Sequence, residues 1–280
     1  MDLMDLNVFR NVVEAGGVTK AAARLGRVQS NVTARIRKLE EDLDVPLFER
    51  DGRGVRLAPA GMVLLPYAER LLEMAREARE AVRGGALSGT LRLGAMESTA
   101  AARLPGPLAA FHRRHPDITL ELRTGHTRLL VTQVLAGELD AALVAGPVQD
   151  PRLEARPVFV EDLLVAMPAD GTEIGTRALS LLVFQPGCSY RRVLEDWVAA
   201  HGVVPDRLVE MNSYHAILGC VTAGMGIALV PASLVESYPG RDGLRLVPLP
   251  AETGRLQTVL VWRAGLPRAR IDALAAVLVA

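Results

Sequence analysis

The stretch KAAARLGRVQSNVTARIRKLEEDL, residues 20–43, decides the fold of the N-terminal part of this chain. Three consecutive alanines predict a slim, short helix over Lys20–Leu25, which Gly26 ends. A longer helix is predicted over Gln29–Leu43, where apolar residues recur at helical spacing: Val32, Ile36, Leu39 and Leu43. Two short helices joined by a tight glycine-containing turn form a helix-turn-helix.

The residues on either side extend this module. Apolar residues at helical spacing predict a first helix over residues 3–14, and Gly16-Gly17 ends it. Thr19 is expected to cap the short helix that follows. Downstream, Pro46–Leu57 contains two extended runs around a glycine-bracketed tip that carries Arg53. This pattern predicts a small hairpin, although an ordinary exposed loop would fit the segment taken alone.

Charge is unevenly distributed here, although the whole chain has 32 basic and 32 acidic residues. No acidic residue lies between Glu14 and Glu40, whereas Lys20 and five further cations do. Such a window can neutralise DNA phosphates, or it can be a solvated helix face. Glutamine and asparagine side chains at the start of a helix suit adenine edges in the major groove, and arginine at a hairpin tip suits the minor groove. The residues predicted to contact DNA are Thr19, Lys20, Gln29, Ser30, Asn31, Thr33, Arg35, Arg37, Lys38, Arg50 and Arg53.

Four segments in order resemble the N-terminal signature of LysR-type transcriptional regulators: KAAARL at 20–25, QSNVTARIRKLEEDL at 29–43, PLFER at 46–50 and LAPAG at 57–61. The resemblance implies a winged helix-turn-helix over residues 1–58, a dimerising linker helix over 59–83, a hinge over 84–89 and an effector-binding regulatory domain over 90–280. It also implies a homodimer or homotetramer that binds an inverted-repeat operator in double-stranded DNA. If the protein is an activator, the resemblance further implies contact with the transcription machinery. Val28 departs from the family, in which a serine usually caps the recognition helix, and Ala34 cannot hydrogen-bond a base.

Residues 59–83 are predicted to form one long helix, with Pro59 in its first turn and Pro66 inside it. A heptad-like seam runs along it: Leu64, Ala68, Leu71, Ala75, Ala78 and Val82. The seam can pack on its own domain or on a second copy of the chain. The family resemblance favours dimerisation, which would place two recognition helices on one face of an inverted repeat.

From Thr90 onward, strands alternate with helices, which indicates an α/β fold with largely parallel sheets. Strands are predicted near residues 91–93, 118–122, 141–144, 163–167, 181–184, 208–211, 227–230, 244–247 and 258–262. The resemblance implies two subdomains with a cleft, as in periplasmic binding proteins. We expect subdomain I to hold about 90–160 and 264–280, subdomain II about 161–263, and the chain to cross between them near 159–162 and 259–263.

Ligands of open α/β sheets bind beyond the carboxyl ends of strands, at helix N-termini. The residues predicted at such positions are Glu97, Ser98, Thr99, Thr124, Gly125, Thr127, Gly146, Cys188, Ser189 and Asn212. Hydroxyls together with free backbone N–H groups favour a carboxylate or another anionic metabolite. Each serine or threonine taken alone can equally be a plain helix cap. Glu97 and His126 would add charge selectivity.

Other functions have less support. The chain has no Walker loop, HExxH pair or G-x-S-x-G elbow, and its five histidines show no ligand spacing, so no enzyme, cofactor or metal site is expected. Apolar runs are too short to span a membrane and the N-terminus does not resemble a secretory signal, so a cytoplasmic location is expected. The open alternatives are a regulator without a ligand, redox sensing through Cys188 and Cys220, and a solute-binding receptor.

Overall fold

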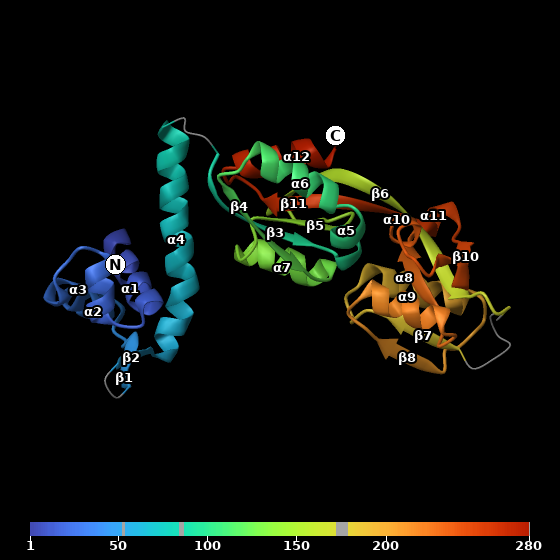
Figure 1. Ribbon diagram of the computed structural model, residues 1–280, viewed down its shortest axis with the longest axis horizontal. Helices are drawn as coiled ribbons and strands as arrows, with labels where there is room; N and C mark the ends of the chain where they lie inside the picture. The colour runs from blue at the N-terminus through green and yellow to red at the C-terminus, as the bar shows by residue number, and fades with distance from the viewer. Residues whose placement is uncertain (52–53, 84–86, 172–178, 280) are drawn as a thin grey trace. The chain divides into compact units, whose positions relative to one another are not determined.

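The computed structural model describes residues 1–51, 54–83, 87–171 and 179–279. The chain divides into two compact units, Met1–Ala86 and Leu87–Ala280, and each has a hydrophobic core of its own (Figure 1). None of the helices within the described residues is both long enough and apolar enough to cross a membrane.

The first unit packs four helices and a two-stranded hairpin. Its elements are α1 (Leu3–Ala15), α2 (Val18–Arg24), α3 (Gln29–Leu43), β1 (Phe48–Asp51), β2 (Gly54–Leu57) and α4 (Pro59–Arg83). The predicted helix-turn-helix, hairpin strands and long helix are thereby confirmed. Asp2 caps α1, since its side chain accepts a hydrogen bond from the Asp5 backbone N–H. The core is formed by Leu6, Phe9, Val32, Leu39 and their neighbours.

Thr19 is not the cap of the short helix, so that prediction is wrong. The chain turns at Gly16, whose φ of 68° is in the left-handed region, and α2 begins directly afterwards at Val18. Gly17 occupies the cap position and its carbonyl accepts a hydrogen bond from the Ala21 N–H. Thr19 is therefore an exposed residue of the first turn. Val28 caps α3 without a side-chain bond, as the family departure predicted.

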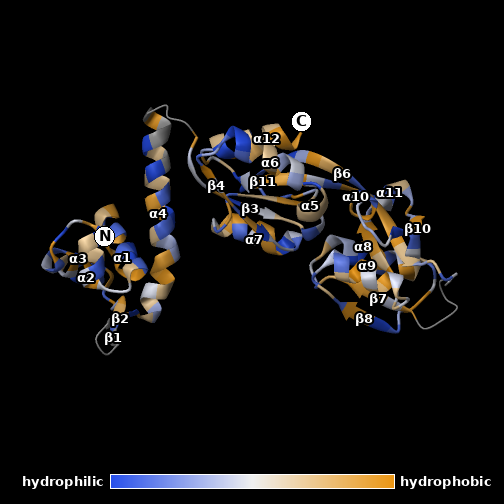
Figure 2. Cartoon of the chain, in the orientation of Figure 1, coloured by the Kyte–Doolittle hydropathy of each residue, from blue (hydrophilic) through white to orange (hydrophobic). Residues whose placement is uncertain are grey.

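The predicted seam on α4 divides between two faces of the helix. Ala68 is fully buried in the core of its own unit, and Leu64 packs against the same core. Ala75 is half-buried, whereas Leu71, Ala78 and Val82 are exposed. Hydrophobic and hydrophilic residues alternate along α4 in Figure 2. The N-terminal part of the seam therefore stabilises its own unit, which was the alternative interpretation.

In the first half of the second unit, helices cover both faces of a sheet. The strands are β3 (Gly89–Ala95), β4 (Ile118–Thr124), β5 (Ala141–Ala145), part of β6 (Leu153–Pro168) and β11 (Arg255–Arg263), in the order β4-β3-β5-β11-β6. The helices are α5 (Glu97–Ala102), α6 (Pro105–Arg114), α7 (Thr127–Ala136) and α12 (Ala269–Leu278). α6 and α12 pack on one face and α7 on the other (Figure 1).

The second half of this unit builds its own core around the far end of β6. β9 (Ala228–Pro231) and β10 (Leu244–Pro248) pair with β6, while β7 (Ser180–Val183) and β8 (Arg207–Glu210) pair with each other. The helices are α8 (Ser189–Ala200), α9 (Tyr214–Thr222), α10 (Ala232–Glu236) and α11 (Ala251–Gly254), and a short 3-10 turn spans Arg241–Gly243. A parallel bridge between Leu181 and Ile227 joins the two strand groups.

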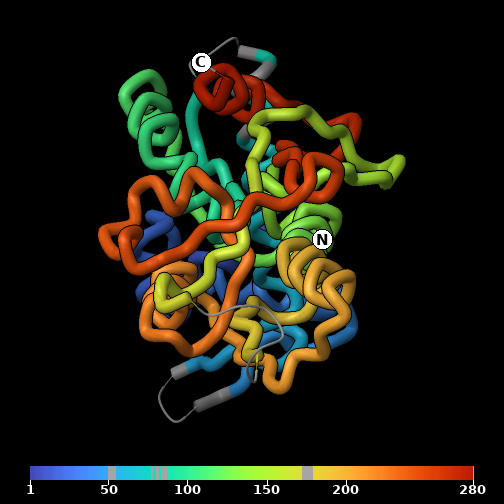
Figure 3. The backbone as a smooth tube through the Cα atoms, turned by 90° about the vertical axis from the view of Figure 1, so that its right-hand side faces the viewer, coloured from blue at the N-terminus to red at the C-terminus, as the bar shows by residue number. Residues whose placement is uncertain are grey.

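β6 and β11 run antiparallel beside each other and carry the chain between the two halves (Figure 3). The first crossing falls near residues 159–162, where it was expected. The second crossing lies earlier than expected, because Thr258–Trp262 already pair with β5 in the first sheet. The sheets are also mixed rather than largely parallel, since β6 and β11 are antiparallel to their neighbours. Sequence periodicity within each strand does not report its direction.

A buried ionic cluster lies where β6 crosses. Glu161, only 2% exposed, accepts two hydrogen bonds from Arg103 at 2.7 and 3.2 Å. The Ser233 hydroxyl on α10 donates a third, at 2.8 Å. The guanidinium of Arg103 also lies 5.9 Å from the centre of the Phe159 ring. The cluster thus ties the end of α5, the crossing strand and a helix of the other half together.

We expect Arg103→Met to lower the free energy of unfolding by about 3 kcal/mol, because it leaves the Glu161 carboxylate buried without its cation. The value falls at the lower end for such pairs because the Arg103 side chain is 37% exposed. Urea denaturation followed by tryptophan fluorescence measures the loss. Arg113→Met, at an exposed position on α6, is the control and should change stability by less than about 0.5 kcal/mol. Equal stability of the two variants would contradict the role given to the cluster.

Candidate functional site

The N-terminal end of α3 presents a polar surface. Gln29, Ser30 and Asn31 in its first turn are exposed, and Arg37 is exposed farther along the helix. The buried side of the same helix, with Val32 and its neighbours, packs on α1 and α2. The apolar spacing of α3 therefore turns its amide and hydroxyl side chains outward. Lys20 and Thr19 are exposed at the start of α2.

Other predicted contacts are engaged within the unit. The Arg35 guanidinium donates to the Asp5 carboxylate at 2.7 Å, and the Lys38 amine lies 3.6 Å from the same carboxylate. Asp5 is 0% exposed, so these cations compensate a buried charge that the first helix carries. Thr33 donates its hydroxyl to the Gln29 carbonyl. Arg35 is therefore held as part of the fold, a use that sequence spacing alone did not reveal.

The hairpin is attached to α3 through a carboxylate. Glu40 accepts hydrogen bonds from the backbone N–H groups of Leu47 and Phe48, at 2.8 and 3.2 Å. Gly61 at the start of α4 packs so closely on Leu47 that an added Cβ would clash with the Leu47 carbonyl oxygen. The side chain of Arg50 and all of Arg53, both predicted to contact DNA, lie outside the described residues.

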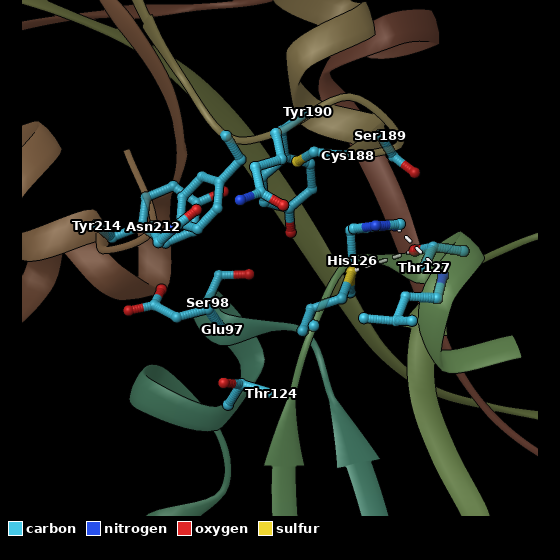
Figure 4. A pocket seen from close by; sticks show the side chains of 15 residues that line it. Glu97, Ser98, Thr124, His126, Thr127, Cys188, Ser189, Tyr190, Asn212 and Tyr214 are labelled. Carbon is cyan, nitrogen blue, oxygen red and sulfur yellow. Dashed lines mark hydrogen bonds between the residues drawn. The ribbon is translucent and has the colours of Figure 1, made fainter. Parts of the chain in front are cut away.

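A cavity of about 250 Å³ lies between the two halves of the second unit (Figure 4). The starts of α5 and α7 and the end of β4 line one side, and the starts of α8 and α9 line the other. Its lining includes eight of the predicted ligand residues: Glu97, Ser98, Thr124, Gly125, Thr127, Cys188, Ser189 and Asn212. Met96, His126, Leu129, Phe184, Gln185, Tyr190 and Tyr214 complete it.

Two of the predicted ligand residues are not part of this lining. Thr99 is 2% exposed and faces into the protein, because α5 turns it away from the cavity. Gly146 packs on β11, where its N–H donates to the Gln257 carbonyl at 2.8 Å and an added Cβ would lie 3.0 Å from Val259. Following a strand in the sequence is therefore not enough to reach the cavity.

The helix starts around the cavity differ in how their N–H groups are satisfied. At α7, the His126 ring nitrogen accepts a hydrogen bond from the Leu129 N–H at 3.3 Å. At α9, Ser213 holds the cap position without a side-chain hydrogen bond, and the Tyr214 N–H lowers the pKa of the nearby Glu97 carboxyl group. At α8, Cys188 holds the cap position without a side-chain hydrogen bond. Of these three helix starts, that of α7 is therefore the one whose cap residue makes a side-chain hydrogen bond.

Two tyrosines that are not among the predicted ligand residues form part of the wall on the side of α8 and α9. Tyr190 and Tyr214 are each 3% exposed, and their ring centres lie 6.3 Å apart. Burial raises the pKa of both phenols well above the usual value, so they stay protonated donors. The Ser98 side chain is close enough to lower both pKa values slightly. Helical spacing gives no signal that separates such residues from core residues.

Cys188 does not have the lowered pKa that its place at a helix start suggested. Burial raises the pKa of its thiol, and the nearby N–H groups of Arg191 and Tyr190 offset only part of that effect. Cys188 and Cys220 are both free thiols. A thiolate is the reactive species of cysteine, so this environment does not favour redox sensing.

Comparison with known proteins identifies the family. The model of the LysR substrate binding domain matches residues 84–280, and that of the bacterial regulatory helix-turn-helix protein, lysR family, matches residues 3–62. The chain belongs to the LysR family of transcriptional regulators. It is therefore a DNA-binding regulator with an effector-binding domain, and the family is not enzymatic.

Relatives of this LysR-type regulator match over nearly its whole length. An uncharacterized HTH-type transcriptional regulator, YusT of Bacillus subtilis, is 40% identical over 94% of this chain and 90% of its own. SoxR of an Arthrobacter species is 38% identical over 94% and 91%. Among solved structures, full-length OxyR of Pseudomonas aeruginosa has a TM-score of 0.68 at 29% identity, covering 99% and 94%. Full-length CbnR in complex with its target DNA has a TM-score of 0.65 at 25% identity, covering 99% of each chain.

Two arginines of α3 should respond differently to the same substitution. Arg37→Gln is expected to remove the phosphate contact predicted for Arg37. It should therefore weaken binding to a DNA duplex of arbitrary sequence and lower the slope of log affinity against log salt concentration by about one. Arg35→Gln is expected to lower the free energy of unfolding by about 1–3 kcal/mol, since buried Asp5 loses its nearest cation. Anisotropy across a salt series and urea denaturation measure the two effects. An unchanged stability of Arg35→Gln would show that Asp5 does not need this partner.

Cys188 is expected to react slowly with iodoacetamide. The usual pKa of a free cysteine is about 8.5. Because burial raises the pKa of the Cys188 thiol, its alkylation rate should rise only at a pH above that value. Intact-mass spectrometry over a pH series measures the rate, and Cys188→Ser assigns the remaining signal to Cys220. A midpoint below that of a free thiol would contradict the effect of burial.

Proposed function

We propose that this LysR-type regulator binds an inverted-repeat operator as a dimer, and that a small molecule in the cavity of the second unit changes this binding. The observation that carries the proposal is the exposed polar first turn of α3, with Gln29, Ser30 and Asn31. These side chains have the length and the hydrogen-bonding groups that base edges require. Lys20 and Arg37 supply charge for the neighbouring phosphates.

The dimer is proposed to form through an exposed apolar stripe on α4. Val63, Tyr67, Leu71, Met74, Ala78 and Val82 follow one another at intervals of four, four, three, four and four residues. Such intervals place them on one face of the helix, next to the face that Ala68 buries in the first unit. Val82 is 89% exposed and Tyr67 57%. A second copy of α4 would cover this stripe, and two such dimers form the tetramer that the family resemblance implies.

The effector is proposed to carry an acidic group. The start of α8 keeps N–H groups without a side-chain cap, next to the Ser189 hydroxyl, and such a helix end favours an anion. His126 caps the start of α7, and the carboxylate of Glu97 lies near the start of α9, where it would repel a second anion. We therefore propose that the anion expected from the sequence binds at the α8 end of the cavity.

Operator selection from a random duplex library, followed by fluorescence anisotropy, tests the proposal. We expect an inverted repeat to be selected and to bind more tightly than a single half-site. Leu71→Glu should be a monomer, as measured by light scattering. This monomer should bind the inverted repeat no more tightly than the single half-site. Leu266→Glu is the matched control, since both leucines are 38% exposed. Selection of no sequence, or a wild-type monomer bound to DNA, would overturn the proposal.

A further inference from the structure

The lining of the cavity holds a carboxylate without a lysine or arginine beside it. Glu97 is its one carboxylate, and no lysine or arginine is among the residues that line it. Arg191, the cation nearest along the chain to the α8 start, is engaged with Glu195 and Glu210 at 2.8 and 2.7 Å. An effector with only an acidic group would therefore enter next to a carboxylate that has no cation in the lining.

One oxygen of Glu97 lacks a partner. The backbone N–H of Tyr214 and the side chain of His215 both lower the pKa of this carboxyl group and so offset part of the effect of burial. The second oxygen, Oε2, is shielded from solvent and has no hydrogen-bond partner among the described residues. Burial raises the pKa of this carboxyl group, so ionised Glu97 gains from a cationic donor. A buried acceptor without a donor costs free energy until a ligand supplies one.

A second unsatisfied group faces the other side of the cavity. The Tyr190 hydroxyl belongs to a side chain that is 3% exposed, and it has no hydrogen-bond partner among the described residues. Tyr190 is in the first turn of α8, whose N-terminus has no side-chain cap. A phenol donor and the free N–H groups of α8 both suit a carboxylate. Figure 4 shows Glu97 and Tyr190 on opposite walls of the cavity.

We propose that the effector is a small zwitterion of the amino-acid type. Its ammonium group binds the carboxylate of Glu97, and its carboxylate binds at the start of α8 beside Tyr190 and Ser189. This inference rests on the proposed function, because it names the ligand class of the same cavity. The volume of about 250 Å³ equals that of roughly eight water molecules. A ligand of amino-acid size fits that space.

The remaining lining suits an aliphatic or aromatic ligand body. Phe184 and Tyr214, whose ring centres lie 4.6 Å apart, belong to the wall of α8 and α9, while Met96 and Leu129 belong to the wall that carries Glu97. Aromatic rings also stabilise an adjacent ammonium group through their negative faces. The two charges of the ligand would thus be matched at Glu97 and at the start of α8. The apolar side chains between these two points would limit the size of the ligand.

Isothermal titration calorimetry of the full chain tests the inference without DNA. The probes are the proteinogenic amino acids and an ω-amino acid series from glycine to 6-aminohexanoate, which varies the distance between the two charges. Each is paired with its deaminated acid and its decarboxylated amine. We expect at least one zwitterion to bind, and both of its singly charged analogues to bind at least about tenfold more weakly.

Variants assign the contacts. Glu97→Gln should weaken the zwitterion at least about tenfold and remove its advantage over the deaminated acid. Tyr190→Phe should weaken the binding of the zwitterion and of the deaminated acid by the same factor. Because this variant keeps the buried aromatic ring, it tests the site even if Glu97→Gln impairs folding. Glu138→Gln, at an exposed position outside the cavity, is the matched control and should bind as the wild type does.

The possible outcomes separate the two proposals. Binding of a deaminated acid as tightly as its amino acid, or no binding by any zwitterion of the panel, overturns the zwitterion inference. Neither result affects operator binding, which anisotropy measures independently. Conversely, a chain that binds a zwitterion but selects no operator overturns the proposed function and leaves the ligand class standing.

Discussion

The pairing of β6 with β11 is the interaction on which the second unit depends. The two strands pair from Leu153 and Arg263 at one end to Asp162 and Arg255 at the other. Both continue from the core of one half toward the core of the other, so the cavity walls are joined by one hydrogen-bonded ribbon. A movement of the walls must bend this ribbon rather than break it. The irregularity at Thr258/Val259 is the point where its register shifts.

The buried carboxylates of this chain differ in the partners that the fold gives them. Glu161 is buried but receives three hydrogen bonds, so it is a structural group. Asp5 in the first unit is likewise buried beside Arg35 and Lys38. Asp5 and Glu97 each keep one shielded oxygen without a hydrogen-bond partner among the described residues. Glu97 differs from the other two carboxylates because no lysine or arginine lines the cavity around it. We therefore assign structural roles to Asp5 and Glu161 and propose a binding role for Glu97.

The sequence predicted the helices and strands better than the contacts between them. The 3.6-residue spacing of Val32, Ile36 and Leu39 located α3 to the residue, because that signal is local. It could not show that Ala68 packs on its own unit, or that Arg35 pairs with Asp5 thirty residues earlier. At the cavity, positions after strands identified Glu97 and Cys188, whereas Tyr214 and Tyr190 were not among the predicted ligand residues. Whether a helix start carries a side-chain cap depends on the rotamer of the residue before it, as with His126 at α7 and Ser213 at α9, and the sequence pattern does not report rotamers.

Helix α5 connects the cavity with the ionic cluster of Arg103 and Glu161. It is six residues long, and its first residue, Glu97, lines the cavity. Arg103 immediately follows it and is bonded to Glu161 on the crossing strand. A ligand that engages Glu97 therefore acts on a short rigid element whose other end is anchored at the crossing. Glu97 also lies near the start of α9 in the opposite wall, so a ligand bound to Glu97 would act on both halves. Allosteric coupling needs contacts that differ between two states, and under our proposal α5 would supply them within the second unit.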